Sequence, residues 1–169
     1  MCGKCLYLEK LPVIMDFTPK KINLYLFLKL PSAFWCGVRV RSIDSKQCLV
    51  AVKHSWKNQN PFHSMYFAVQ AMAAELSTGA LVMQHIHRSG HKISMLVAGS
   101  KSSFSKKATG RITFTCHDGQ QIAAAIRQTL ADGEGHAIRM KSIGTNEQGE
   151  RVSEMEFEWT IRKKSSNIR

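Results

Sequence analysis

The segment of residues 64–83 constrains the fold of this chain more than any other. Its side chains are apolar or small on nearly every side, and they include one carboxylate, Glu75. A surface helix of this length would show a polar face, so we expect the rest of the domain to wrap around this one. Because a buried carboxylate is costly unless it is paired or in use, Glu75 is the first candidate for a functional residue.

The flanking segments predict an α+β fold. Thr18 and Pro19 begin a helix that ends before Pro31, and the central helix is expected to start with Ser64 as its N-cap and to close at Gly90. Alternating apolar and polar residues predict strands at 34–43, 49–56, 92–101, 110–117 and in a final hairpin around 144–149. This order predicts an antiparallel sheet curled around one long central helix, with an extra N-terminal helix and a short helix between strands.

The length of the chain predicts a single domain, at residues 18–162, because 169 residues are enough to bury one core well. Residues 1–17 are the expected poorly ordered extension, and residues 163–169 are a basic tail. The five cysteines are scattered, and we expect no signal peptide ahead of them. These features favour reduced thiols and a cytoplasmic location.

Residues 22–30 form the most apolar stretch near the N-terminus. They are fewer than the ~20 residues that a membrane span needs, and Lys29 interrupts them, so we expect no membrane span. We favour an amphipathic helix packed on the edge of the domain. Because Lys20 and Lys21 are adjacent, a helix lying on a membrane surface is the alternative.

A short motif at the start of the central helix resembles a known family. The segment Asn60-Pro61-Phe62-His63-Ser64-Met65-Tyr66, followed by Ala73-Ala74-Glu75-Leu76, is similar to the N-x-x-G-[ST]-M-Y…A-E-L pattern of thioesterases of the hotdog superfamily. The branch concerned is close to the phenylacetyl-CoA thioesterase-like enzymes and often bears only the label of a domain of unknown function. The resemblance extends over residues 18 to 162, and the fold it implies is the hotdog fold. His63 stands where related sequences often have glycine, and the histidine-glycine-glycine signature of the better-known branch is absent.

The resemblance implies hydrolysis of an acyl-CoA thioester at a dimer interface, in a homodimer or a dimer of dimers. By position in the motif, Glu75 would activate water or attack the thioester, and Asn60 would orient the carbonyl or the water. The backbone amides of Ser64 and Met65 would hold the developing oxyanion, because amides at a helix N-terminus are free donors. The substrate would be an acyl-CoA or an acyl-carrier thioester, with no cofactor beyond the coenzyme A of the substrate.

Two further residues of the same loop are candidates for substrate contact. Asn58 could exchange roles with Asn60, although loop hydrogen bonding before Pro61 is common for such residues. His63 is either a contact to the thioester or an exposed loop histidine.

The chain carries 24 Lys and Arg against 12 Asp and Glu, a net charge of +12, which favours an anionic partner. We expect the densest basic patch either to cradle the phosphates of coenzyme A or to be a solvated strand end; it comprises Lys101, Lys106, Lys107 and Arg111. The patch has no recognisable nucleic-acid motif and one aromatic for stacking, Phe104. We therefore expect no nucleic-acid partner.

Other functions remain as alternatives. A hotdog module that binds acyl-CoA or another ligand without turning it over is the main one, followed by a basic nucleic-acid-binding protein and by a hydratase acting on acyl thioesters. We expect no metal site, because His85 and His87 point to different faces of a helix end and His91 lies beyond Gly90.

Overall fold

The computed structural model describes residues 17–164. The elements in chain order are α1 (Pro19–Lys29), α2 (Pro31–Trp35), β1 (Arg39–Ile43), β2 (Cys48–Lys53), the 3-10 helix η1 (Trp56–Asn58), α3 (Phe67–Ser89), β3 (Ile93–Phe104), β4 (Arg111–Cys116), α4 (Gly119–Asp132), β5 (His136–Thr145) and β6 (Arg151–Lys163). The predicted N-terminal extension lies outside the described residues except for Phe17, whose ring is 5.5 Å from that of His87. The predicted tail lies outside them beyond Lys164.

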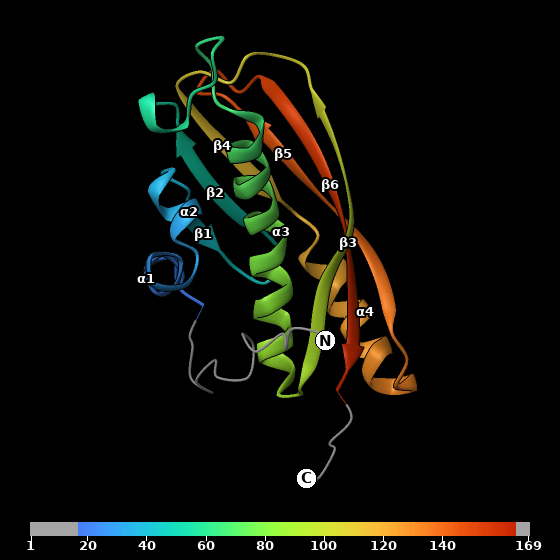
Figure 1. Ribbon diagram of the computed structural model, residues 1–169. Helices are drawn as coiled ribbons and strands as arrows, with labels where there is room; N and C mark the ends of the chain where they lie inside the picture. Colours follow the sequence, from blue (N-terminus) through green and yellow to red (C-terminus); the bar gives the residue numbers. More distant parts are fainter. Residues whose placement is uncertain (1–16, 165–169) are drawn as a thin grey trace, which may run out of the picture.

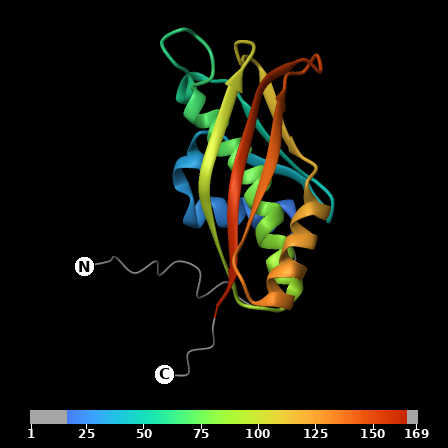
Figure 2. The ribbon, with the colours of Figure 1, turned by 90° about the vertical axis from the view of Figure 1, so that its right-hand side faces the viewer.

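The six strands form one antiparallel sheet in the order β1-β2-β4-β5-β6-β3. The sheet curls around α3, which packs mainly against β2, β4 and β5 (Figure 1). α4 lies beside the C-terminal half of α3, and Figure 2 shows β5, β6 and β3 on the side of the sheet that faces the viewer, with α3 behind them. The predicted α+β hotdog arrangement is confirmed.

α3 is buried because its side chains are small where the sheet comes close. A Cβ added at Gly79 would lie 3.1 Å from the ring of Trp159, and the indole N–H of Trp159 donates to the Thr78 hydroxyl at 3.0 Å. The helix ends at Gly90, whose φ of 69° is the left-handed cap that glycine favours. It begins at Phe67, with Tyr66 as N-cap, so the prediction of Ser64 as N-cap was wrong. No helix within residues 17–164 is long and apolar enough to cross a membrane.

The first predicted strand is partly helical. Pro31 begins α2, which runs to Trp35, and Gly37 with φ 89° turns the chain into β1 only at Arg39. The guanidinium of Arg39 lies 3.6 Å from the centre of the Phe34 ring and donates to the Phe34 carbonyl at 2.8 Å. These contacts hold the short helix α2 against β1. The alternation of side chains in the sequence did not reveal this helix.

α1 packs along β1, at one edge of the sheet. Its inner residues Ile22 and Leu26 are buried, and the Asn23 side chain donates to the Val40 carbonyl and accepts from the Val40 N–H, both at 2.9 Å. The favoured position of this helix at the domain edge is confirmed. The helix is not amphipathic, however, because Leu24 and its neighbours on the outer side are apolar and exposed. At the opposite edge of the sheet, β3 pairs with β6 and with no other strand of the described chain.

Candidate active site

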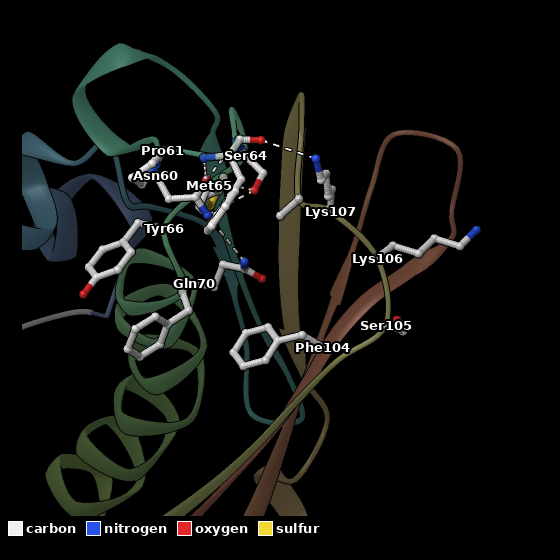
Figure 3. A pocket seen from close by; sticks show the side chains of 13 residues that line it. Asn60, Pro61, Ser64, Met65, Tyr66, Gln70, Phe104, Ser105, Lys106 and Lys107 are labelled. Carbon is white, nitrogen blue, oxygen red and sulfur yellow. Dashed lines mark hydrogen bonds between the residues drawn. The ribbon is translucent and has the colours of Figure 1, made fainter.

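A pocket of about 560 Å³ opens at the N-terminal end of α3. Its lining comes from the loop before α3, from the first turn of α3 and from residues 104–108, at the end of β3 and just after it (Figure 3). Three rings in contact stand at its rim: Tyr66 and Phe67, with ring centres 4.9 Å apart, and Phe104, whose centre is 6.4 Å from that of Phe67. All three are largely exposed. An exposed cluster of aromatic rings around a concave site is typical of a surface that binds an apolar ligand.

Asn60 organises the loop that forms one wall of this pocket. Its Oδ1 accepts from the backbone N–H groups of Phe62 at 2.9 Å and Ser64 at 3.2 Å, and its Nδ2 donates to the Ser64 hydroxyl at 3.1 Å. One Nδ2 hydrogen remains for a ligand, since an amide nitrogen has two. Asn60 therefore has a structural role in the loop and can still donate into the pocket.

The amides predicted to hold an oxyanion are already in use. The Ser64 N–H donates to Asn60, and the Met65 N–H donates to the Ala108 carbonyl at 2.8 Å. At this end of α3, the backbone N–H groups of Phe67 and Ala68, in the first turn, have no hydrogen-bond partner in the described chain. These two donors stand at the positive end of a 23-residue helix. The free amides of this helix end thus lie two to four residues after Ser64 and Met65, the two that the sequence indicated.

Asn58 has no amide hydrogen left for a substrate. The side chain is 3% exposed, donates to the carbonyls of Cys36 and Lys53 at 2.9 Å each, and accepts from the Ser55 N–H at 2.9 Å. It fastens the loop to β2 and to the end of α2, so the structure gives it a structural position rather than the substrate contact expected above.

His63 is an exposed loop residue that does not line the pocket. Its φ of 54° is in the left-handed region that favours glycine. This conformation explains in physical terms why the related motif carries glycine at this place.

Gln70 is a pocket residue that the sequence reasoning missed. It is 4% exposed, and its Nε2 donates to the Met65 carbonyl at 3.4 Å, but its buried Oε1 has no partner within residues 17–164 (Figure 3). A buried acceptor without a donor is unusual in proteins. The signal in the sequence was a polar side chain one turn inside the apolar segment.

The four predicted basic residues do not converge. Lys106 and Lys107 line the pocket, but Lys106 forms an ion pair with Glu150 at 2.5 Å, and Figure 3 shows its side chain extending away from the pocket. Lys101 is paired in register with Glu156, on the outer face of the sheet, and Arg111 lies 4.0 Å from Glu147. Lys107, which donates to the Phe62 carbonyl at 3.4 Å, is the member of this set that lines the pocket without an acidic partner in the described chain.

Glu75 lies on α3 beyond the pocket. Its carboxylate has no hydrogen bond or ion pair to any residue from 17 to 164, and Oε1 is 3.2 Å from where a Cβ of Gly79 would stand. Burial raises its pKa to about 7 from an ordinary value of 4.5. At 1.5 Å per residue, Glu75 is about 12 Å along the helix from Phe67. The structure therefore does not bring Glu75 and Asn60 together within one chain.

Metal ligands do not gather anywhere in the described part of the chain, where no group of three His, Cys, Asp or Glu side chains is placed to hold an ion. The pocket itself offers free helix amides, a side-chain amide and an aromatic rim, and the half-buried carboxylate of Glu75 lies farther along α3.

Comparison with solved structures places this fold among known proteins. A Pseudomonas aeruginosa protein of unknown function described as a "Probable Thioesterase" is 21% identical, with a TM-score of 0.71 over 86% of this chain and 97% of that chain. A thioesterase from Haemophilus influenzae is 8% identical, with a TM-score of 0.67 over 92% and 97% of the two chains. A thioesterase from Staphylococcus aureus is 12% identical, with a TM-score of 0.57 over 74% and 93%. No curated protein matches the chain.

At these identities the similarity defines the fold: the chain is a hotdog-fold protein of the same architecture as solved thioesterases. The match to a family is more direct. The family described as a domain of unknown function, DUF4442, matches residues 21–161, and the chain belongs to it.

Proposed function

We propose that the protein is an acyl-CoA thioesterase whose active site is completed by a second copy of the chain. The observation that carries the proposal is the Glu75 carboxylate: it is half-buried on an apolar helix, lacks a partner in the described chain, and has its pKa raised to about 7 by desolvation. A group with that pKa is suited to accept a proton from water near neutral pH.

The spacing of Asn60 and Glu75 supports the same activity. Two variant structures of the Staphylococcus aureus thioesterase replace a glutamine in one case and, fifteen positions later in that chain, a glutamate in the other, each with alanine. Asn60 and Glu75 have the same separation here. An amide side chain before the central helix and a carboxylate inside it are thus the pair we assign to the chemistry.

In the proposed reaction, Asn60 acts on the thioester carbonyl and Glu75 acts on the attacking water. The thioester carbonyl would accept hydrogen bonds from Asn60 Nδ2 and the Phe67 N–H, which stabilise negative charge as it develops on the oxygen. Glu75 would take a proton from water as the water oxygen attacks the carbonyl carbon. The carbon–sulfur bond then breaks, the coenzyme A thiolate leaves, and the proton held by Glu75 neutralises it.

The second copy is needed because Asn60 lines the pocket whereas Glu75, about 12 Å along α3 from Phe67, does not. The open edge of β3 offers the place for it, since strand addition pairs the free N–H and C=O groups of an edge strand. In such a pair, Glu75 of one copy would complete the pocket that Asn60 forms in the other.

Two pocket residues would bind the coenzyme A portion. The unpartnered Oε1 of Gln70 suits an amide N–H such as those of the pantetheine arm. Lys107 suits a phosphate. The aromatic rim of the pocket would hold the apolar acyl chain.

The experiment measures free-thiol release from a panel of acyl-CoA thioesters of increasing chain length. Wild type is compared with Glu75→Gln, Asn60→Ala and Glu134→Gln. Glu134 is an exposed glutamate beyond α4 and serves as the matched control. We expect Glu75→Gln to lower kcat by ~100-fold or more and Asn60→Ala by ~10-fold or more, with Glu134→Gln unchanged. Absence of turnover on every substrate, or unchanged turnover in Glu75→Gln, overturns the proposal of a thioesterase with Glu75 as its base. Binding of acyl-CoA without turnover would point to the non-catalytic module.

Mixed oligomers test the shared site. When Asn60→Ala and Glu75→Gln chains are refolded together, a shared site leaves one intact site in each mixed dimer and restores about a quarter of wild-type activity. A site contained within one chain restores none.

A further inference from the structure

The outer side of α1 and α2 is apolar although it faces solvent. The exposed fractions are 57% for Leu24, 48% for Phe27, 62% for Leu28, 41% for Leu30 and 63% for Trp35. We call these five residues the α1–α2 face. Single exposed apolar side chains are common, but five large ones between residues 24 and 35, on two consecutive helices, are a concentration of the kind that marks an interaction site.

The α1–α2 face is held in place by the rest of the fold. Asn23 bonds both backbone groups of Val40, and the rings of Phe27 and Phe34 meet edge to face at 5.0 Å. Leu26, on the inner side of α1, is fully buried. The exposure of the outer side is therefore a fixed feature of the surface and not the result of a loosely packed helix.

Positive charge accompanies this face. Lys20 lies four residues before Leu24 and eight before Leu28, on the same side of the helix, and Lys29 stands in its last turn. Both lysines are exposed, and no ion pair joins either to an acidic residue of the described chain. From residue 17 to residue 74 the sequence has eight Lys and Arg and one acidic residue, Asp44. The part of the sequence that contains the face is therefore strongly basic, and two of its cations, Lys20 and Lys29, stand on the helix itself.

We propose that the α1–α2 face docks on an anionic phospholipid surface. A helix that buries apolar side chains at the level of the headgroups while its lysines meet acidic lipids binds in this way, and a tryptophan such as Trp35 is favoured at that depth. A second copy of the chain fits less well, because a two-fold contact would bring Lys20 and Lys29 of the two copies close together. The face lies at the opposite edge of the sheet from β3 (Figure 1), so it stays accessible in the dimer proposed above.

The test is sedimentation of the full chain with vesicles of phosphatidylcholine alone or mixed with phosphatidylglycerol. Leu28→Ser is compared with Leu96→Ser, because Leu96 is 66% exposed and lies on β3, away from the face. Lys20→Glu is compared with Lys92→Glu, an exposed lysine just before β3. Circular dichroism checks that each variant is folded, and light scattering gives its mass.

We expect the wild type to bind the mixed vesicles, to release at high salt and to bind phosphatidylcholine alone much more weakly. Leu28→Ser should lower the partition coefficient about tenfold and Lys20→Glu at least about fivefold, while the two controls bind like wild type. No binding to the mixed vesicles overturns the proposal, as do equal binding to both kinds of vesicle and equal loss in Leu96→Ser. A fall in mass in Leu28→Ser would identify the face as a contact between copies and would likewise overturn it.

Discussion

The Glu75→Gln substitution is expected to stabilise the fold above neutral pH while it removes activity. Glu75 has its pKa raised to about 7 because the charged form loses hydration on α3. In the unfolded chain the carboxyl titrates near its ordinary value of 4.5. Between these two values the folded state binds more protons than the unfolded state, so its free energy of unfolding falls as the pH rises. Above pH 7 the wild type carries the full cost of a charged, desolvated carboxylate, and glutamine does not.

The magnitude follows from the two pKa values. At 1.36 kcal/mol per pH unit, the difference between 4.5 and about 7 corresponds to about 3 kcal/mol. The side chain keeps partial contact with water, which lowers the cost, so we expect Glu75→Gln to be more stable than wild type by about 1 to 3 kcal/mol at pH 8. Near pH 4.5 most of this difference disappears because the folded-state carboxyl is protonated.

Urea denaturation followed by circular dichroism at pH 4.5 and pH 8, at one fixed protein concentration, measures both values, and Glu134→Gln is the control. Equal stability of wild type and Glu75→Gln at pH 8 would refute the desolvation argument. Greater stability of the wild type there would show that the carboxylate has a cationic or hydrogen-bonding partner, and the proposed role as base would fall with it.

Three further outcomes follow from the site. Because the backbone of His63 is in the left-handed region, His63→Gly should keep the free energy of unfolding within about 1 kcal/mol of wild type. The β-branched substitution His63→Val should lower the free energy of unfolding by about 1–2 kcal/mol. Equal stability of the two variants in thermal denaturation would contradict this reasoning. Asn58→Ala should lower the free energy of unfolding by about 3 kcal/mol, because it leaves two partly buried carbonyls and one N–H without partners; an unchanged melting temperature would show that water replaces the side chain. Lys107→Ala should raise KM for acyl-CoA about fivefold with kcat unchanged, and Lys101→Ala, on the outer face, should leave KM as it is; equal effects would mean that only net charge matters.

The parts of the fold that could be predicted are those with one strong local pattern. The uniform apolar character of residues 64–83 identified the buried helix, and with it Glu75, because no surface helix tolerates that composition. Asn60 was found from the motif, and the structure places it in the pocket wall.

The remaining features depend on contacts between distant segments. The N-cap of α3 was placed two residues too early because Ser64 is a good N-cap in isolation. In the fold, Asn60 engages Ser64 and the Met65 N–H donates to the Ala108 carbonyl. The side of the sheet on which each basic side chain lies could not be predicted from the sequence either. A register shift between Val97 and Gly99 in β3 decides which later side chains point outward, and it sends Lys101 away from the pocket.

The two edges of the sheet differ in a way that limits assembly. A sheet with two free edges is a template for an open polymer, because each added copy exposes a new edge. Here the edge at β1 is closed: the Asn23 amide occupies the N–H and C=O of Val40 that a further strand would need. Strand addition at β3 can therefore join two copies and then has nowhere to continue. One asparagine in α1 thus blocks strand addition at one edge, so that the pairing proposed at the β3 edge would end with two copies and would not extend into a fibre.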